Sequence, residues 1–187
     1  VHRGTLPPLA SWLVDTGING SVYVLASRTV AGFHGVSARK ALEAANLKTR
    51  FIEIDDSETA KTLDQTERLL YELNDAGATR DSAILALGGG VTGDLAGLVA
   101  AMYMRGIALV QVPTTLLAQV DAAIGGKVGV NHPRAKNLIG TIFQPHLVLS
   151  DPDTLATLPV RQLASGMAEV VKTAIIGSAP LFEQLRT

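Results

Sequence analysis

The sequence predicts an α/β fold in which helices flank a mostly parallel sheet. Short apolar or β-branched stretches alternate along the chain with longer stretches of amphipathic helical periodicity. The short stretches are apolar throughout, which is typical of strands covered on both faces. Hydrophobic residues make up 47% of the chain and charged residues 18%, enough to bury a core around such a sheet. Together these observations favour the α/β class.

Predicted strands and helices alternate over most of the chain. The predicted strands are Ser21–Ala26, Thr49–Ile54, Ala83–Leu87, Ala108–Val112 and His146–Leu149. The predicted helices are Leu6–Val14, Ser37–Ala45, Thr59–Ala76, Gly93–Met102 and Thr115–Ala122. Because a helix separates most successive strands, the strands are expected to be connected by crossovers and to run parallel.

The segment Ile124–Asn137 differs from its surroundings. It combines turn-forming residues with basic side chains: Gly125, Gly126, Gly129, Pro133, Lys127, Arg134, Lys136 and His132. We expect a long ordered loop here. Loops of this length inside compact domains usually carry function.

The pattern becomes purely helical after Pro159. A helix is predicted over Val160–Ile176, another begins at Pro180, and no strand follows. We therefore expect an α/β domain over residues 1–159 and the beginning of an all-α domain over residues 160–187. The chain starts at Val1 rather than Met, so we also expect residues before it.

Composition and charge exclude several classes of function. A net charge of −1 with interspersed signs gives no footprint for nucleic acid, and 4% aromatic residues leave few base-stacking platforms. The chain has no cysteine, which excludes disulfides and thiol catalysis. Its longest apolar stretch, Leu95–Met104, is too short to span a membrane, and no signal peptide is visible. These features fit a cytoplasmic protein.

A glycine-rich turn follows the predicted strand Ala83–Leu87. Gly88, Gly90 and Gly93 match the spacing G-x-G-x-x-G between a strand and a helix. Such glycines let the backbone approach a pyrophosphate, and free N–H groups at the helix start point at the anion. A tight turn without a ligand is the alternative, since no carboxylate lies about 20 residues downstream to bind a ribose. Asp94 is either a first-turn helix acid or a contact to ribose or nicotinamide, and we favour nucleotide binding.

Four cations lie beside turns or predicted strand ends rather than on exposed helix faces. They are Arg105, Lys127, Lys136 and Lys172. Cations held by rigid loops suit an anionic, phosphorylated substrate. Solvated surface charges are the alternative interpretation, and spacing alone does not show that the four converge.

Glu169 and Lys172 lie three residues apart on one face of a predicted helix. They form either a modest ion pair or a metal-binding carboxylate beside a substrate-binding lysine. Zinc needs three or four ligands, and neither a second acid nor a histidine pair accompanies Glu169. Glu169 alone therefore cannot hold a metal.

Several segments resemble one enzyme family. They are GGGVTGDLAG (88–97), YMRGI (103–107), QVPTTLLAQVDAAIGGKVGVN (111–131), KNLIG (136–140), DTLATLP (153–159) and AEVVK (168–172). In these segments, and in Asp56–Lys61, the chain resembles the 3-dehydroquinate synthases over nearly its whole length. The resemblance implies a Rossmann-like NAD-binding domain followed by an all-α metal-binding domain, with NAD and Zn²⁺ or Co²⁺ as cofactors. It also implies a homodimer.

The resemblance assigns roles to individual residues. NAD is expected to be held by Asp56, Glu58, Lys61, Gly90, Val91, Thr92, Gly93, Asp94, Thr114, Thr115, Lys127, Lys136, Thr154, Leu155, Ala156 and Thr157. Catalytic or substrate-binding roles fall on Arg105, Asp121, Lys127, Asn137 and Lys172. Glu169 is expected to be the first zinc ligand.

The implied reaction belongs to the shikimate pathway of aromatic amino acid biosynthesis. It converts 3-deoxy-arabino-heptulosonate 7-phosphate, a phosphorylated keto-sugar acid, to 3-dehydroquinate with elimination of phosphate. NAD⁺ transiently oxidises a ring hydroxyl that zinc polarises, and the hydride is later returned.

Three departures from the family pattern stand out. Ser27 and Thr29 occupy positions where the family carries an acid and an asparagine for the adenosine ribose, and the intervening Arg28 raises the alternative of NADP preference. Ala122-Ala123 replaces a serine pair. Two histidine metal ligands are expected beyond Thr187, so the chain is predicted to be inactive alone.

Alternative functions remain open. Another sugar-phosphate cyclase, such as a 2-deoxy-scyllo-inosose or epi-valiolone synthase, shares most of these motifs. Related metal-dependent alcohol and glycerol dehydrogenases share the glycine turn but are not expected to carry the segment GGKVGVN with KNLIG. A non-catalytic nucleotide-binding remnant is a third interpretation, although such a remnant has no physical need for Lys127, Lys136, Glu169 and Lys172.

Overall fold

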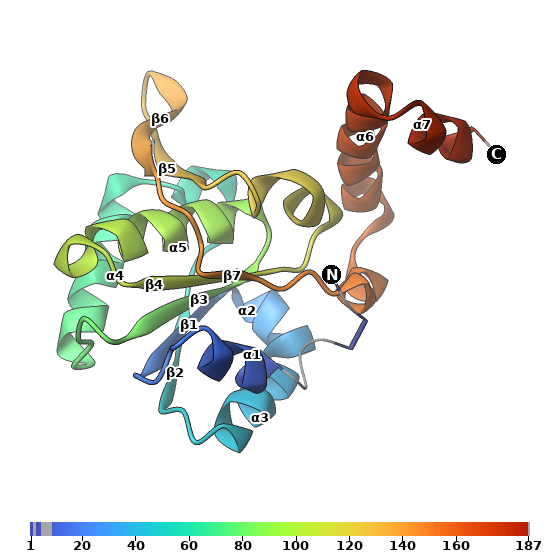
Figure 1. Ribbon diagram of the computed structural model, residues 1–187. Helices are drawn as coiled ribbons and strands as arrows, with labels where there is room; N and C mark the ends of the chain where they lie inside the picture. The colour runs from blue at the N-terminus through green and yellow to red at the C-terminus, as the bar shows by residue number, and fades with distance from the viewer. Residues whose placement is uncertain (2, 5–8, 187) are drawn as a thin grey trace.

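A five-stranded parallel sheet with the order β2-β1-β3-β4-β7 lies at the centre of the protein (Figure 1). The computed structural model describes residues 1, 3, 4 and 9–186. The strands are β1 (Val22–Ala26), β2 (Thr49–Glu53), β3 (Ala83–Gly88), β4 (Ala108–Pro113) and β7 (Leu147–Val148). Every neighbouring pair is parallel, so the predicted α/β class is confirmed, with each strand near its predicted place.

The burial of the strands follows from their place in the sheet. β1 and β3 are buried along their whole length, as their unbroken apolar sequences predict. β2 lies at the edge, where only Ile52 is buried. β7 pairs through two residues and is shorter than the predicted strand His146–Leu149.

Helices cover both faces of the sheet (Figure 1). One face carries α1 (Leu9–Asp15) and α3 (Val36–Ala44), and the other carries α4 (Leu63–Asp75) and α5 (Gly90–Met102). Successive side chains of β1 point alternately into the two core clusters, because side chains alternate along a strand. The predicted first helix began at Leu6, and residues 5–8 lie outside the described part of the chain.

The helix predicted over Ser37–Ala45 begins earlier. Helical structure starts with α2 (Arg28–Val30) and passes through the π-helical turn η1 (Ala31–Gly35) into α3. Ser27 caps this start, since its Oγ accepts a hydrogen bond from the N–H of Val30 at 3.4 Å. The predicted start was wrong because two glycines in η1 resemble a turn.

The boundaries of the other predicted helices also shift. The predicted helix Thr59–Ala76 is divided into the 3₁₀ turn η2 (Glu58–Ala60) and α4, which Thr62 caps. α5 begins at Gly90 rather than Gly93, because the glycine turn itself forms the first helical turn. The helix predicted over residues 115–122 is confirmed from residue 116 and ends in the π-helical η4 (Ala118–Ala122).

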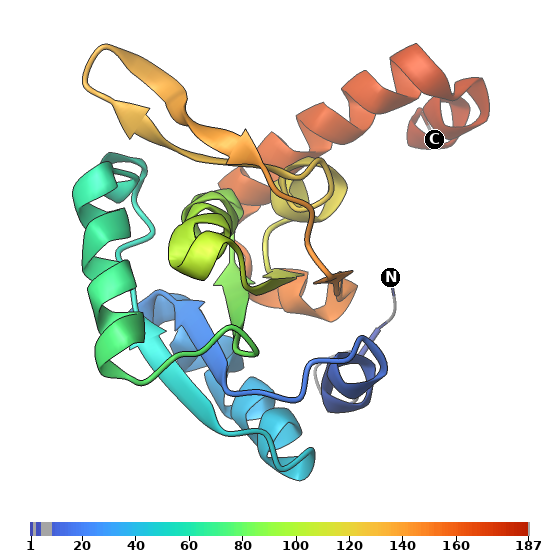
Figure 2. The ribbon, with the colours of Figure 1, turned by 60° about the vertical axis from the view of Figure 1, so that its left-hand side comes forward.

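The segment expected to be a long loop is instead an antiparallel hairpin. Its strands are β5 (Lys127–His132) and β6 (Ala135–Ile142), so the loop prediction was wrong. Gly129 lies opposite Gly140, and a Cβ on either glycine would lie within 2.5 Å of a backbone oxygen of the partner strand. The glycines that suggested a loop therefore permit close strand pairing. The hairpin projects beyond the helices (Figure 2).

The C-terminal part is helical, as predicted. The 3₁₀ segment η5 (Pro152–Thr157) leads into α6 (Val160–Gly177) and α7 (Ala179–Leu185). α6 extends away from the sheet (Figures 1 and 2) and touches the body near η4, where Gly166 packs on Leu116. In the described ranges, no helix has the length and apolar character needed to cross a membrane.

Candidate functional site

The order of the strands creates a crevice at the carboxyl edge of the sheet. From β1 the chain first crosses to β2 on one side, and then to β3 on the other. The connections that leave β1 and β3 therefore diverge, and ligands of parallel α/β sheets bind at such a switch point. Ser27 follows β1 at this point, and the glycine turn follows β3.

The glycine turn is held closely against its neighbours. A Cβ on Gly88 would lie 2.4 Å from Oγ1 of Thr92, and a Cβ on Gly89 would lie 3.0 Å from Cγ2 of Thr115. The carbonyl of Gly88 accepts a hydrogen bond from the N–H of Thr114 at 2.9 Å. Predicted cofactor residues 90–94 and 114–115 therefore adjoin one another.

The hydroxyl of Thr92 is an unusual feature of this turn. Thr92 is fully buried, and its Oγ1 has no hydrogen-bond partner among the residues that the structure describes. It lies in the first turn of α5, whose backbone N–H groups and dipole favour an anion. A buried polar group without a partner costs about 1–3 kcal/mol. Because this hydroxyl is closed to solvent, the backbone N–H groups at the start of α5 are the groups suited to an anionic ligand.

Three predicted site residues from separate elements meet beside this turn. The ammonium of Lys61, which follows η2, contacts the carboxylate of Asp94 on α5. It also donates a hydrogen bond to Oδ1 of Asn137 on β6 at 2.5 Å. Lys61 is 3% exposed, so its charge depends on these partners.

Asp94 has a different setting from the one predicted. α5 begins at Gly90, so Asp94 lies outside the first turn and the interpretation as a first-turn helix acid is wrong. Burial raises the pKa of Asp94, and this effect outweighs the hydrogen bond and charge of Lys61 that lower the pKa. The negative charges of Glu58 and Asp121 raise the pKa further.

A cleft of about 510 Å³ lies between α5 and the hairpin. Among its lining residues are four predicted site residues: Asp94, Asp121, Lys127 and Asn137. Ala122, which departs from the family pattern, and Gly125 also line it. The cleft thus joins the predicted cofactor side to the predicted substrate side.

One polar residue at this site was missed from the sequence. The side chain of Asn131 on β5 contacts both Glu58 and the backbone of Asn137. It lay in the segment expected to be a loop, where a polar residue carries no special signal. A strand assignment there would have indicated that Asn131 faces one side of a hairpin.

Predicted cofactor residues 154–157 lie on η5. The buried amide of Gln119 donates hydrogen bonds to Oγ1 of Thr154 at 3.1 Å and to the carbonyl of Asp151 at 2.9 Å. Oγ1 of Thr157 lies 3.2 Å from Nε2 of His34 on η1. Burial lowers the pKa of His34, although the charge of Asp151 opposes the shift. The contact between Thr157 and His34 joins this segment to the helix that follows β1, and the bonds of Gln119 join it to η4.

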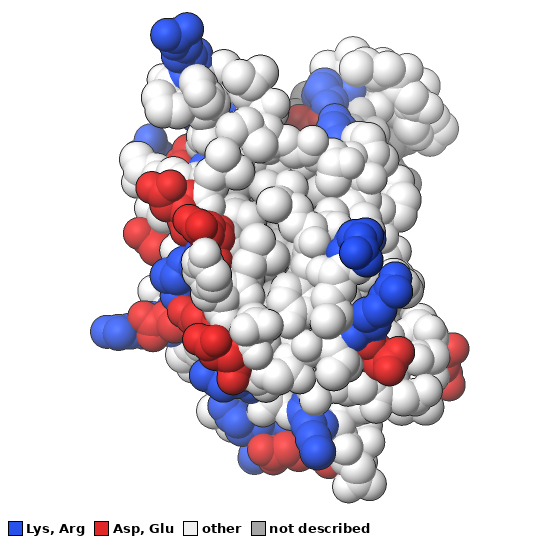
Figure 3. Space-filling model, turned by 90° about the vertical axis from the view of Figure 1, so that its left-hand side faces the viewer, with Lys and Arg blue, Asp and Glu red and all other residues white. Residues whose placement is uncertain are grey.

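The remaining predicted residues are not gathered into the cleft. Arg105 lies at the end of the 3₁₀ turn η3 (Tyr103–Arg105) with a positive φ of 68°, and its side chain is exposed. Lys136 and Asp56 are also exposed. Figure 3 shows acidic and basic side chains along both margins of one face, with an uncharged area between them.

The predicted metal ligand lies on α6. The carboxylate of Glu169 pairs with the ammonium of Lys172. Within the described ranges, no group of three or more His, Cys, Asp or Glu side chains could hold a metal ion. The described residues therefore do not supply a complete set of metal ligands around Glu169.

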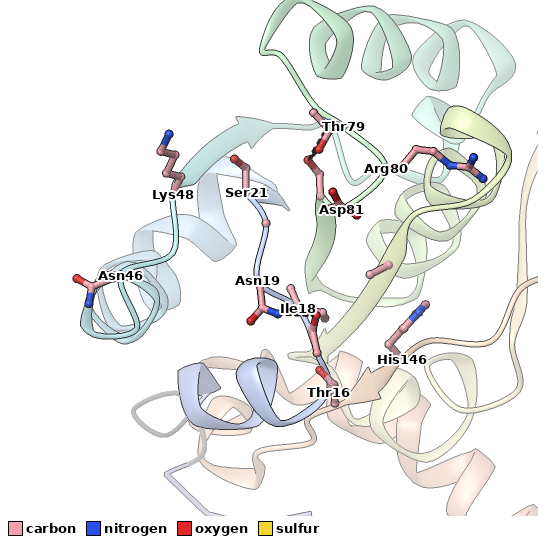
Figure 4. Close-up of a pocket in the computed structure, with 14 residues that line it drawn as sticks. Thr16, Ile18, Asn19, Ser21, Asn46, Lys48, Thr79, Arg80, Asp81 and His146 are labelled. Atoms are coloured by element: carbon pink, nitrogen blue, oxygen red, sulfur yellow. Dashed lines mark hydrogen bonds between the residues drawn. The ribbon is translucent and has the colours of Figure 1, made fainter.

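A larger depression, of about 720 Å³, lies at the opposite edge of the sheet (Figure 4). It is lined by residues that precede the strands, and Lys48, Arg80 and His146 point in different directions around it (Figure 4). Ligand sites of parallel sheets form at the carboxyl edge instead. Although this depression is larger than the cleft beside α5, its position argues against a functional site there.

Comparisons with known proteins identify the family of this chain. Residues 51–165 match the family model described as 3-dehydroquinate synthase N-terminal. A 3-dehydroquinate synthase of Pelotomaculum thermopropionicum is 51% identical over 97% of this chain and 49% of its own length. The chain thus spans about half the length of the curated relatives it matches.

Solved structures show the same architecture. The 2-epi-5-epi-valiolone synthase of Streptomyces hygroscopicus subsp. jinggangensis, with NAD⁺ and Zn²⁺ bound, matches 98% of this chain and 51% of its own, with 34% identity and a TM-score of 0.89. A 2-deoxy-scyllo-inosose synthase, complexed with carbaglucose-6-phosphate, NAD⁺ and Co²⁺, matches 91% of this chain and 47% of its own, with 32% identity and a TM-score of 0.85. By its sequence and its Rossmann-like fold, the chain belongs to the 3-dehydroquinate synthase N-terminal family.

Proposed function

We propose that this chain is the NAD-binding half of a 3-dehydroquinate synthase. The reaction converts 3-deoxy-arabino-heptulosonate 7-phosphate to 3-dehydroquinate with elimination of phosphate, so the complete enzyme is a carbon–oxygen lyase. The observation that carries the proposal is the meeting of Lys61, Asp94 and Asn137 beside the glycine turn. Asp94 and Asn137 line one cleft, and the buried ammonium of Lys61 contacts both of them.

The residues around the glycine turn fit a dinucleotide. The N–H groups at the start of α5 are suited to pyrophosphate oxygens. Thr114 and Thr115 follow β4 next to the turn and suit the nicotinamide half. Residues 154–157, beside the helix that follows β1, suit the adenine half. Bound NAD⁺ supplies a reversible hydride acceptor.

The chain's own polar residues would bind and orient the substrate. Lys127 and Asn137 line the cleft, where an ammonium and an amide attract and orient anionic and hydroxyl groups. Asp94 holds the ammonium of Lys61 in place between cofactor and substrate sides. Arg105 and Lys172 are proposed to reach the substrate only when the rest of the protein surrounds the cleft.

Metal chemistry is proposed for the complete enzyme only. Glu169 would contribute one carboxylate ligand for Zn²⁺ or Co²⁺, and the described residues do not supply the others. We propose that residues 1–159 form the NAD-binding domain and that residues 160–187 begin the helical metal domain. The chain alone is then catalytically inactive, and a homodimer of the complete enzyme remains a prediction.

Another sugar-phosphate cyclase is the second candidate. It is favoured by the solved valiolone and inosose synthases, which are 34% and 32% identical to this chain. The curated 3-dehydroquinate synthases reach 51% identity and thus favour the first proposal. A non-catalytic remnant is less favoured, because Lys61 is a buried charge that a remnant has no reason to keep.

Titration calorimetry with NAD⁺ and then NADP⁺ tests the proposal. We expect saturable NAD⁺ binding that is lost in Asp94→Ala or Lys61→Ala and kept in Glu183→Ala, whose carboxylate lies on α7. Circular dichroism would verify that each variant is folded. Failure of the folded wild-type chain to bind either nucleotide would contradict the proposal. With the helical half added, phosphate release from the heptulosonate, and not from other sugar phosphates, would separate this enzyme from other cyclases.

A further inference from the structure

Asn131 forms hydrogen bonds to three residues of the candidate site. Its Nδ2 donates hydrogen bonds to Oε1 of Glu58 at 2.8 Å and to the carbonyl of Glu58 at 3.1 Å. Its Oδ1 accepts the N–H of Asn137 at 2.8 Å. Its own backbone N–H donates to the carbonyl of Lys61 at 2.8 Å.

These bonds close a ring through the site. The N–H of Asn131 binds the carbonyl of Lys61, and the ammonium of Lys61 binds Oδ1 of Asn137. The N–H of Asn137 returns to Oδ1 of Asn131. Each member of the ring is thus held by the other two, and the 58–61 segment is tied to the hairpin.

Asn131 contacts two residues, Glu58 and Asn137, that have little other support. Glu58 is exposed, so without the amide of Asn131 its carboxylate would rotate freely. Asn137 adopts a φ of +54°, a conformation that costs energy for a residue other than glycine. The hydrogen bond from its N–H to Asn131 holds this backbone conformation, and its amide oxygen accepts a separate hydrogen bond from the ammonium of Lys61.

The chemistry of these contacts requires an amide at position 131. One end of the side chain faces a carboxylate and a carbonyl, which only accept, and the other end faces an N–H, which only donates. Asparagine carries a donor group and an acceptor group on one short, rigid plane. An aspartate would keep the bond to Asn137 but place a second carboxylate against Glu58.

We propose that Asn131 is a positioning residue that orients Glu58 toward the nucleotide and fixes Asn137 against Lys61. The inference rests on the proposed NAD-binding function and adds a residue to it. Asn131 acts through its neighbours rather than by touching the cofactor. Its loss should therefore weaken NAD⁺ binding out of proportion to any loss of stability.

A polarity swap tests the link to Glu58. In Asn131→Asp the facing carboxylates repel, and we expect NAD⁺ affinity to fall about tenfold, the effect of one hydrogen bond to a charged group. In Asn131→Asp/Glu58→Gln the new amide donates to the new carboxylate, so the double variant should bind NAD⁺ no more weakly than Glu58→Gln alone. Asn19→Asp is the control, because Asn19 is an exposed asparagine that donates to the carbonyl of Gly17 at 3.3 Å near the opposite edge of the sheet.

Thermal unfolding separates positioning from stability. The positioning role is refuted if the losses of NAD⁺ affinity in Asn131→Asp and Glu58→Gln multiply in the double variant. It is also refuted if the loss of affinity in each variant simply follows the fall in its unfolding temperature. Recovery of affinity in the double variant at an unfolding temperature like that of Asn131→Asp supports it.

A second measurement does not depend on nucleotide binding. Hydrogen exchange of the Asn137 amide, followed by NMR, should be about tenfold faster in Asn131→Ala than in the wild-type chain, because the bond that protects it is removed. Unchanged exchange would overturn the inference. A wild-type chain that fails to bind NAD⁺ while Asn137 exchange responds to Asn131→Ala would refute the proposed function and leave the ring of bonds supported.

Discussion

The packing of the hairpin on α5 leads to a sharp prediction for Gly97→Ala. A Cβ at position 97 would lie 2.2 Å from Cγ1 of Val128 and 2.9 Å from its Cβ, on the inner face of β5. Carbon atoms in contact normally lie about 3.5–4.0 Å apart, so the separation between the new Cβ and Cγ1 of Val128 must grow by more than about 1 Å. Rotating Val128 would move Cγ1 but not its Cβ, so the strand itself must shift.

The expected magnitude follows from two opposing effects. Overpacking a core contact costs about 1–3 kcal/mol, and replacing a helical glycine by alanine returns about 0.5–1 kcal/mol. The free energy of unfolding should therefore fall by about 1 kcal/mol, and by at most about 2.5 kcal/mol, which lowers the unfolding temperature by about 2–4 °C for each kcal/mol in a chain of this size. Because the displaced hairpin carries Lys127 and Asn137, NAD⁺ affinity should fall as well.

Urea unfolding and calorimetry with NAD⁺ check this prediction. Gly177→Ala is the matched control, since it adds the same atom to a helical glycine with nothing within 4 Å, and it should raise stability by at most about 0.5–1 kcal/mol. Adding Val128→Ala to Gly97→Ala should recover part of the loss. If Gly97→Ala has wild-type stability and NAD⁺ affinity, the hairpin does not pack on α5 as described.

Three further changes have defined outcomes. Tyr103→Phe removes the hydroxyl that donates to the buried carbonyl of Ala78 at 3.0 Å, and urea unfolding should show a loss of about 1–2 kcal/mol. Glu53→Gln weakens the 3.0 Å ion pair that occupies Arg28 near the end of β1, so the ratio of NADP⁺ to NAD⁺ affinity measured by calorimetry should rise several-fold; an unchanged ratio would exclude Arg28 from cofactor preference. Because burial raises the pKa of Asp94, its contribution to stability is present below the ordinary value of 3.8 and is lost as pH rises through the higher folded value. Across that pH window the unfolding temperature should therefore fall less with rising pH in Asp94→Asn than in wild type. Equal slopes of unfolding temperature against pH would contradict the raised pKa of Asp94.

Much of the fold could be predicted from the sequence because its signals are local. β1 and β3 are unbroken apolar stretches, and the glycine turn sits between a strand and a helix. The hairpin was missed because its key contact, Gly129 against Gly140, is a pairing between strands that no local pattern records.

In the site too, local motifs could be predicted from the sequence but contacts between distant segments could not. The family motifs identified Lys61, Asp94 and Asn137 as separate contacts, but not that they touch one another. Lys61 and Asp94 are separated by 33 positions and meet only because a crossover helix places η2 beside α5. The chain of bonds through Asn131 depends on the same placement, so only the folded structure reveals it.

The π-helical turns η1 and η4 constrain how the chain tolerates changes in length. Each lies close to the carboxyl edge of the sheet, η1 just after β1 and η4 just after β4. A π-helical turn holds one residue more than a regular turn, so the sequence beyond it is rotated by about 100° relative to an uninterrupted α-helix. Deleting one residue from η1 would convert it to a regular α-helical turn and leave the apolar face of α3 toward the sheet, because the π turn already accommodates the extra residue. A single-residue deletion should therefore be better tolerated in η1 than within α3 itself, where it would rotate every later side chain of the helix by about 100°.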